Sequence, residues 1–532
     1  MTALPSPEGP TGFFWTAGAR GALEVLRCSG CGRLQHPSAR ACPDCAASTL
    51  EPAPVSGEAT VVTHTLNAQR WPVPHREPPY LIAVVALAED PRVQLTTNLV
   101  GVEPDEITHG LPVQTQFEPQ GEVWLPVFTP RAGAPAPDPE PPTRIHIRPP
   151  ATADRFEDRV AITGVGASER GRRLGRPGAA LTLDAARAAI DDAGLQASDI
   201  DGLCVYPGSS GMPGVSDGGV REVEQMLTLH PTWHAGAHET PGQTGMVVEA
   251  MLALAAGLCR HVLCVNTVST DFLPSVAAID GELQWRVPFG AFSPANWIAL
   301  CANRYLARYG ASRETFGAIA IAARAHAARN PEALFTEPLS MEAYLSARTI
   351  STPFGLLDCD VPCDGSIAVV VSRRELASDL RQPPVHVDAV GTQIAEPQSW
   401  DAGPLTHQSN VLGPAAHLWT RARVARAEVD VALLYDGFTF NAVTWLEALG
   451  FCGLGEAPDF VAGGERIGPG GALPLNPHGG QLSAGRSNGY GGLREAVLQL
   501  RGQAGERQVA AAKTAVLSSG GGIPAGCMLL TA

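Results

Sequence analysis

The sequence of 532 residues predicts an α/β protein with two unequal parts. Three observations carry this prediction. Residues 131–153 are rich in proline, which makes a semi-rigid linker without a core of its own. Short β-type runs separated by turn residues fill residues 51–130, which is typical of a small all-β barrel. From residue 154 onward strand and helix signals alternate, which favours a layered α/β domain with parallel strands.

The small part begins with a cysteine-rich stretch. Residues 1–50 are expected to hold a short N-terminal helix and a ribbon built around the cysteines, and residues 51–130 a barrel. The strands expected in the barrel are apolar or β-branched runs, at residues 59–66, 80–87, 113–117 and 123–128. Residues 131–153 form the linker, and residues 154–532 form the large domain.

Buried strands and helices alternate in the large part. Strands are expected at the apolar runs 160–166, 200–205, 262–268, 368–371 and 431–435. Residues 181–193 carry apolar side chains at helical spacing, and Gly194 is placed to end that helix. Residues 246–258 are the most apolar run, but they contain Glu249 and are too short to span a bilayer. We therefore expect a buried helix there.

Four cysteines lie in two Cys-x-x-Cys pairs, Cys28 with Cys31 and Cys42 with Cys45. Four thiolates can close a tetrahedral site, which suits zinc and leaves no open coordination position. The pattern therefore predicts a structural zinc ion that stabilises the ribbon and takes no part in catalysis. A ribbon without metal and a redox-active pair are the alternatives.

The charge balance argues against one class of partner. The net charge is −15 and the pI is near 5.4, whereas binding to nucleic acid needs a basic face. The first residues lack the basic and then apolar stretches of a secretory leader. The eight cysteines outside the two pairs follow no spacing pattern, as in reduced cytoplasmic proteins. We expect a cytoplasmic protein with no membrane span and no nucleic-acid partner.

Residues 12–130 resemble a known pair of modules, a rubredoxin-like zinc ribbon followed by an OB-fold. The resemblance is carried by Phe14 and Trp15, the two cysteine pairs, and the stretch 55–61 (Val-Ser-Gly-Glu-Ala-Thr-Val). This pair of modules accompanies thiolase-like enzymes of acyl-CoA metabolism. The resemblance implies that the small part is the partner module of such an enzyme, joined to it here in one chain.

Residues 155–532 resemble the thiolases through several motifs in the same order. These are 330–333 (Asn-Pro-Glu-Ala), 363–370 (Cys-Asp-Gly-Ser-Ile-Ala-Val-Val), 476–480 (Asn-Pro-His-Gly-Gly) and the closing glycines 520–522. The stretches 499–502 and 507–509 are similar to the lipid-transfer-protein branch of that family. The resemblance implies the thiolase-like layered αβαβα fold, coenzyme A as part of the substrate, and a homodimer.

The residues that give a thiolase its chemistry are replaced at four positions. Gly242 stands where a thiolase has its nucleophilic cysteine, and a glycine cannot form an acyl-enzyme. Arg486 stands at the position of the catalytic histidine, and Ser518 at that of the second cysteine. Tyr435 begins the stretch Tyr-Asp-Gly-Phe, where thiolases have Asn-Glu-Ala-Phe or a related motif.

This pattern is similar to that of one subgroup, the thiolase-like aldolases of steroid side-chain degradation. They cleave a β-hydroxyacyl-CoA by a retro-aldol reaction, and their proposed catalytic groups are two tyrosines. The resemblance implies Tyr435 and Tyr490 as those groups here. It also implies a steroid 17-hydroxy-20-carboxyl-CoA as substrate, a 17-ketosteroid and propionyl-CoA as products, and an enoyl-CoA hydratase that supplies the substrate and docks on the small domain.

The other candidate residues follow from the chemistry of the step. A tyrosine can transfer protons if its pKa is lowered, and the Arg486 cation is suited to lower it or to stabilise the enolate. His478 is a further candidate donor or acid. By analogy with thiolases, an oxyanion hole and substrate pocket are expected at Gly520, Gly521, Gly522, Ser518 and Gly242.

Two other functions stay open from the sequence. A thiolase or Claisen acyltransferase would need a nucleophilic cysteine elsewhere, and the candidates are Cys204, Cys264, Cys363 and Cys452. A non-catalytic carrier of acyl-CoA or sterol would bind its ligand without turnover. The reactivity of the thiols separates the first of these from an aldolase.

Overall fold

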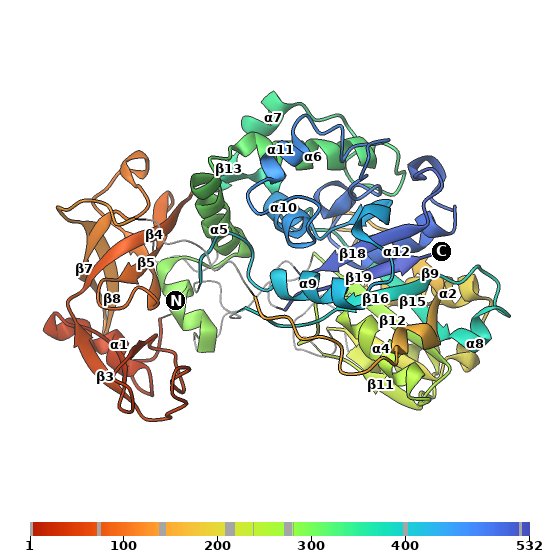
Figure 1. Cartoon of the computed structure of the whole chain (residues 1–532), viewed down its shortest axis with the longest axis horizontal. Helices are drawn as coiled ribbons and strands as arrows, with labels where there is room; N and C mark the ends of the chain where they lie inside the picture. The colour runs from red at the N-terminus through yellow and green to blue at the C-terminus, as the bar shows by residue number, and fades with distance from the viewer. Residues whose placement is uncertain are drawn as a thin grey trace.

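The N-terminal ribbon is a three-stranded antiparallel sheet (Figure 1). The computed structural model describes residues 4–71, 76–137, 145–207, 219–237, 239–270, 279, 281–396, 403–520 and 524–532. The expected short helix is α1 (Gly12–Thr16), followed by a 3-10 turn over Ala17–Arg20. The strand order is β2 (Leu34–Gln35), β1 (Leu23–Cys28) and β3 (Leu50–Val55).

The barrel contains the four expected strands, which are β4 (Glu58–Asn67), β5 (Tyr80–Leu87), β7 (Pro112–Gln120) and β8 (Val123–Pro130). β4 pairs with both β5 and β7, which closes the sheet on itself. The sequence does not predict the further strand β6 (Gln94–Leu99). Its polar residues interrupt the apolar pattern, yet Asn98 is buried because its Nδ2 donates to Leu81 O at 2.8 Å and Phe289 O at 2.9 Å.

The barrel sheet continues into the large part of the chain, beside the green helix α5 (Pro294–Tyr309) in Figure 1. The hairpin β13 (Thr349–Ser351) and β14 (Phe354–Gly355) extends the sheet from β4. The Thr65 and Ser351 hydroxyls lie 2.8 Å apart, and Leu66 N donates to Thr352 Oγ1 at 2.9 Å. The two parts that the sequence separates therefore share one sheet.

The linker is held at both ends. Its described residues, 131–137 and 145–153, contain neither helix nor strand. At one end Ala136 N donates to Gly110 O of the barrel at 2.9 Å. At the other, Arg148 N donates to Gln393 Oε1 at 2.9 Å, and Gln393 Nε2 donates to His146 O at 2.6 Å.

Two mixed sheets form the large domain. The first has the order β11 (Trp233–Ala235), β10 (Gly202–Tyr206), β12 (His261–Val268), β15 (Gly365–Arg373) and β9 (Val160–Ala167). The second has the order β16 (His386–Gly391), β19 (Gly526–Thr531), β18 (Thr514–Ser519) and β17 (Val431–Leu433). The expectation of parallel strands is wrong for β15 and β19, which run antiparallel to their neighbours. Alternating strand and helix signals do not fix strand direction.

The layers follow from side chains that alternate along each strand. Cys204 and Leu517 face a central core with α4 (Gly245–Ala255) and α12 (Tyr490–Leu500), which lie between the sheets. Leu203 faces α2 (Gly178–Ala193) on the outside of the first sheet, and Val516 faces α9 (Leu412–Arg421) and α10 (Thr439–Ala448) outside the second. This order of layers is the expected thiolase-like αβαβα fold.

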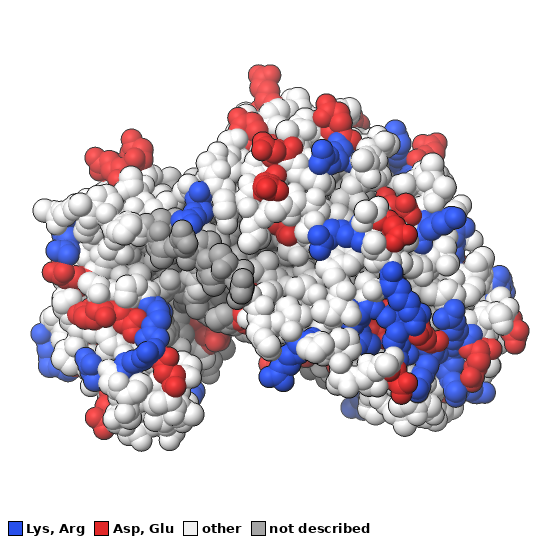
Figure 2. Space-filling view, in the orientation of Figure 1, with Lys and Arg blue, Asp and Glu red and all other residues white. Residues whose placement is uncertain are grey.

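The remaining helices are α3 (Gly219–Leu227), α6 (Arg313–Ala327), α7 (Met341–Leu345), α8 (Arg374–Ala377) and α11 (Ala457–Val461). Gly194 ends α2 in the left-handed conformation, as predicted. Among the described residues, every helix is too short or too polar to cross a bilayer. On the face shown in Figure 2, Lys and Arg side chains are interleaved with Asp and Glu, even at the lower right where they are densest.

Candidate active site

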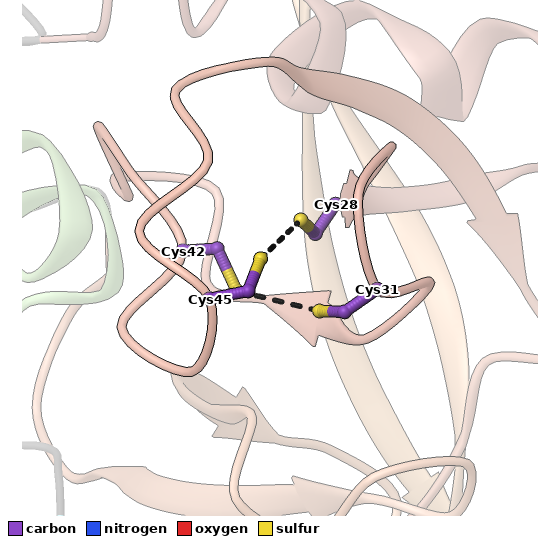
Figure 3. A group of neighbouring side chains, drawn as sticks. All are labelled: Cys28, Cys31, Cys42 and Cys45. Atoms are coloured by element: carbon purple, nitrogen blue, oxygen red, sulfur yellow. Dashed lines mark hydrogen bonds between the residues drawn. The ribbon is translucent and has the colours of Figure 1, made fainter.

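The four cysteines of the ribbon converge on one point (Figure 3). All their Sγ atoms lie within 4.8 Å of one another, with Cys28 and Cys45 3.5 Å apart and Cys31 and Cys42 3.6 Å apart. Tetrahedral zinc with Zn–S bonds of about 2.3 Å places its sulfurs roughly 3.8 Å apart. Because all four positions are thiolates, the residues fit a closed structural zinc site.

Zinc binding by the four cysteines can be tested by substitution. Replacing Cys28 and Cys45 by Ser is expected to reduce bound zinc from about one ion per chain to nearly none, because two ligands cannot close the site. Metal analysis of the purified protein measures this. The matched control is Cys452→Ser, whose thiol lies outside the ribbon and which should keep its zinc. Equal zinc in all variants would contradict the assignment.

A cavity opens near the carboxyl ends of the parallel strands β17 and β18, where α/β proteins commonly bind ligands. Its walls come from the end of each strand, the loop that follows β17, the 476–489 loop and the start of α12. The lining residues are Leu433, Leu434, Tyr435, Asp436, Asn476, His478, Gln481, Ser487, Gly489, Gly492, Leu517 and Ser518.

Tyr435 is the half-buried phenol of this cavity. It follows β17, and its backbone N–H donates to Ser518 Oγ at 2.9 Å. Ser518, which stands at the position of the second thiolase cysteine, thus holds the backbone of Tyr435 in place. The glycine that follows Asp436 makes room for the ring, because a Cβ on Gly437 would lie 2.7 Å from Tyr435 Cε1.

The pKa of Tyr435 lies above the ordinary value for a phenol, chiefly because the group is buried and also because Asp360 is near. The Arg486 cation and the Gln481 amide oppose this rise without reversing it. The expected lowering of this pKa by Arg486 is therefore not the net result. At neutral pH the side chain carries its proton and is a donor.

Arg486 is neutralised by a carboxylate. Its Nε and Nη2 each donate to Asp360 at 2.7 Å, a two-pronged ion pair. Asp360 follows the 3-10 turn Leu356–Asp358, and Asp360 N donates to Gly437 O at 2.9 Å. The ion pair therefore joins the loop after β14 to the 476–489 loop, and the backbone hydrogen bond of Asp360 joins it to the loop that carries Tyr435.

Asp436 and Gln481 join the loop that follows β17 to the 476–489 loop. Gln481 N donates to Asp436 Oδ1 at 2.8 Å, and Gln481 Oε1 accepts from Ser487 N at 3.1 Å and Asn488 N at 3.0 Å. Gly480, at φ +62°, starts a π-helical turn, and a Cβ there would lie 1.8 Å from Asp436 Oδ2. A glycine is required beside the carboxylate.

His478 lies deep in the same wall and is 7% exposed. Burial, with Arg170 and Arg507 nearby, lowers its pKa well below the ordinary value. The ring is therefore neutral at physiological pH, where it can donate or accept a hydrogen bond but carries no acidic proton to give. Of the two predicted roles of His478, a neutral ring supports the hydrogen-bond donor and not the acid.

Tyr490 does not line the cavity that Tyr435 lines. It is the first residue of α12, is fully buried, and packs in the core between the sheets. The pKa of its hydroxyl is raised by burial and by Cys264, Cys204 and Tyr206. Since Tyr206 also raises the pKa of Tyr435, it lies near both tyrosines. The catalytic part of Tyr490 stays a prediction.

Gly242 occupies a closed position before α4. Its φ is +70°, and a Cβ there would lie 2.2 Å from Ser519 Oγ and 2.8 Å from Ser519 O. The Thr244 and Ser519 hydroxyls, 2.7 Å apart, hold this turn. Gly520, at φ +105°, accepts from Gln408 Nε2 at 3.2 Å. Gly521 and Gly522, also expected in the oxyanion hole, lie outside the described residues.

Sequence reasoning missed Asp360, Asp436 and Gln481 as members of the site. Asp436 stands inside the motif that identified Tyr435, so the motif itself was a usable signal. Asp360 and Gln481 had none, because their partners Arg486 and Asp436 are distant in the sequence.

The four alternative cysteines are poor nucleophiles or lie outside the cavity, and in the described part of the chain no cysteine lines it. Burial raises the pKa of Cys204 well above its ordinary value, that of Cys363 to about 11 and that of Cys452 to about 12. Cys264 is fully buried in β12.

We predict that iodoacetamide leaves activity within about twofold, because no cysteine of the described residues lines the cavity and burial keeps Cys204, Cys363 and Cys452 protonated near pH 8. Activity assays after alkylation, with intact-mass counting of modified thiols, check this. Rapid inactivation that acyl-CoA prevents would instead point to a cysteine nucleophile.

Three family models match separate segments of the chain. The rubredoxin-like zinc ribbon domain of ChsH2 matches residues 15–51, and the C-terminal OB-fold domain of ChsH2 matches residues 53–118. The thiolase C-terminal domain-like model matches residues 398–529. Fold and cysteine site thus define a thiolase-like protein that carries its own zinc-ribbon and OB-fold module.

Relatives narrow the family. The chain is 33% identical over 395 residues to a steroid side-chain-cleaving aldolase from Thermomonospora curvata, covering 70% of this chain and 98% of that protein. It is 32% identical over 382 residues to a 17-hydroxy-3-oxo-4-pregnene-20-carboxyl-CoA lyase from Mycobacterium tuberculosis, with the same coverage. A solved Ltp2-ChsH2(DUF35) aldolase has a TM-score of 0.64 at 32% identity, covering 70% of this chain and 98% of that one. The chain belongs to the family of these steroid side-chain-cleaving aldolases and lyases.

Proposed function

We propose that this protein is an acyl-CoA aldolase that cleaves a β-hydroxyacyl-CoA by a retro-aldol reaction. The β-hydroxyl group loses its proton, the bond between the α and β carbons breaks, and the β carbon becomes a ketone. The bonding electrons pass to the α carbon as a thioester enolate, which then takes up a proton. No acyl group is transferred to the protein, so no nucleophilic cysteine is needed.

One observation carries the proposal: Tyr435 places a protonated phenol in a cavity of a thiolase-like frame. At neutral pH this phenol carries a proton, which a general acid can give to the enolate carbon. The Arg486 cation lies near that hydroxyl and partly offsets the negative charge of its partner Asp360. The closed position at Gly242 leaves no space for a thiolase nucleophile.

The names of the relatives support a steroid substrate. We propose a steroid 17-hydroxy-20-carboxyl-CoA, which would give a 17-ketosteroid and propionyl-CoA. The test is a panel of β-hydroxyacyl-CoA esters with secondary or tertiary hydroxyl groups and small or steroid acyl groups, with products identified by mass. Ketone release fastest from the tertiary steroid ester is the expected result. Release only from small linear esters would overturn the substrate, and release from none would overturn the function.

We further propose a homodimer, which the thiolase-like fold favours. The strand β11 supports this, because it lies at an edge of the first sheet with its residues partly exposed. Light scattering after size exclusion should give twice the chain mass of 55.6 kDa.

The proposed substrate must be produced by a preceding enzyme. Adding water to an α,β-unsaturated acyl-CoA makes a β-hydroxyacyl-CoA, so we propose an enoyl-CoA hydratase as the preceding enzyme and the small domain as its docking module. Co-elution of the two purified proteins, lost when residues 1–130 are blocked by an antibody fragment, is the expected result.

A further inference from the structure

Three buried polar atoms around the cavity have no hydrogen-bond partner among the described residues. They are Asp436 Oδ2, Gln481 Nε2 and His478 Nδ1. Their residues are only 2%, 3% and 7% exposed. Leaving a buried polar group unpaired costs about 1–3 kcal/mol, so such atoms commonly bind a ligand or an ordered water.

The three residues line one cavity together with Tyr435. The volume open to the centre of a water molecule is about 10 Å³ there. One buried water needs roughly that volume. A buried water also needs two to four polar partners, and the wall offers a carboxylate acceptor, an amide donor and an imidazole nitrogen.

We propose that this cavity holds one water molecule bound by Asp436, Gln481 and His478, and that Asp436 accepts through it the proton that the β-hydroxyl group loses. The inference rests on the proposed aldolase function. The water accepts a hydrogen bond from Gln481 Nε2 and donates to Asp436 Oδ2 and His478 Nδ1, which requires the neutral imidazole to carry its hydrogen on Nε2.

The protons balance in this relay. The substrate O–H passes its proton to the water, which passes one of its own to the Asp436 carboxylate. After the carbon–carbon bond breaks, Tyr435 gives its proton to the α carbon. Asp436 then returns its proton through the water to the Tyr435 phenolate, and the site is restored. Asp436 is therefore a positioning and relay residue that acts through the water.

The electrostatics of the carboxyl suit this part. The pKa of Asp436 is raised to about 7, chiefly by burial and also by Asp360, while the backbone of Gln481 and the side chain of Asn476 lower it. The other titratable groups facing the cavity are Tyr435, which is protonated, and His478, which is neutral. The Arg486 cation is paired with Asp360. A base with a pKa near the working pH is the most effective.

The test compares the pH dependence of cleavage in two isosteric variants with the wild type. Wild-type kcat is expected to rise with pH to a plateau, with an inflection near pH 7, because the relay needs the ionised carboxylate. Asp436→Asn should lower kcat at pH 8 by about 10²-fold or more and remove the inflection. Gln481→Glu keeps the acceptor for Ser487 N and adds a charge beside Asp436, so the inflection should move to higher pH.

The matched control is Asp430→Asn, the same change in a carboxylate that accepts from Lys513 N and Thr514 N before β17. The inflection in its kcat–pH profile should lie at the same pH as in the wild type. A crystal structure at high resolution should show one water among the three side chains. Cleavage with an unchanged inflection in Asp436→Asn, or a cavity without water, would overturn the relay alone. A wild type that cleaves nothing would overturn the function and the relay together, while the density would still decide the water site.

Discussion

Replacing Tyr435 by Phe is expected to lower kcat for carbon–carbon cleavage by about 10²–10⁴-fold, the usual contribution of a general acid. The phenol lines the cavity and keeps its proton because burial and Asp360 raise its pKa. The ring should still pack beside Gly437, so the fold and acyl-CoA binding should be retained. Steady-state kinetics together with calorimetric acyl-CoA binding measure the two effects separately.

The control for this variant is Tyr309→Phe, a half-buried tyrosine of α5 outside the cavity, which should keep its activity. The variant Tyr490→Phe tests whether the second predicted tyrosine takes part in catalysis. A loss comparable with that of Tyr435→Phe would place the Tyr490 hydroxyl in the reaction, whereas a purely structural residue would change stability and leave kcat in place. Full activity in Tyr435→Phe would contradict the proposed acid.

Restoring a cysteine at Gly242 is expected to destabilise the protein by about 2–5 kcal/mol and not to create a thiolase. Roughly 1–2 kcal/mol comes from a side chain in the left-handed region, and about 1–3 kcal/mol from overpacking against Ser519. Chemical denaturation measures the free energy of unfolding, and intact mass after incubation with acyl-CoA detects an acyl-enzyme.

Gly257→Cys is the matched control for this substitution. Gly257 follows α4 with a similar φ of +77°, but nothing lies within 4 Å of its Cβ position. It should therefore show the backbone contribution alone, about 1–2 kcal/mol. A Gly242→Cys variant with wild-type stability, or one that carries an acyl group, would show that the nucleophile position is open.

Much of the fold could be predicted because buried strands contain continuous apolar runs, as in β5 and in residues 262–265 of β12. β6 escaped prediction because its buried Asn98 and Thr97 are satisfied by distant backbone carbonyls. The hairpin of β13 and β14 is too short to stand out, and its strand pairing comes from the barrel. Strand direction in β15 and β19 depends on chain connections that apolar patterns do not report.

The candidate site could be predicted only where a motif marks it. Tyr435, His478 and Ser518 were found through motif positions, and all three line the cavity. Tyr490, chosen from the same loop, instead faces the core because helix α12 starts at that residue. The ion pair of Arg486 with Asp360, which sets the charge beside Tyr435, joins residues far apart in the sequence.

The most direct test of cleavage without acyl transfer is a reaction of the purified protein with the 17-hydroxy steroid acyl-CoA ester and no free coenzyme A. We expect ketone and shorter acyl-CoA in equal amounts, at a rate that added coenzyme A does not increase, and a protein mass without an acyl adduct. Products that appear only when free coenzyme A is added, or an acyl group attached to the protein, would contradict the account.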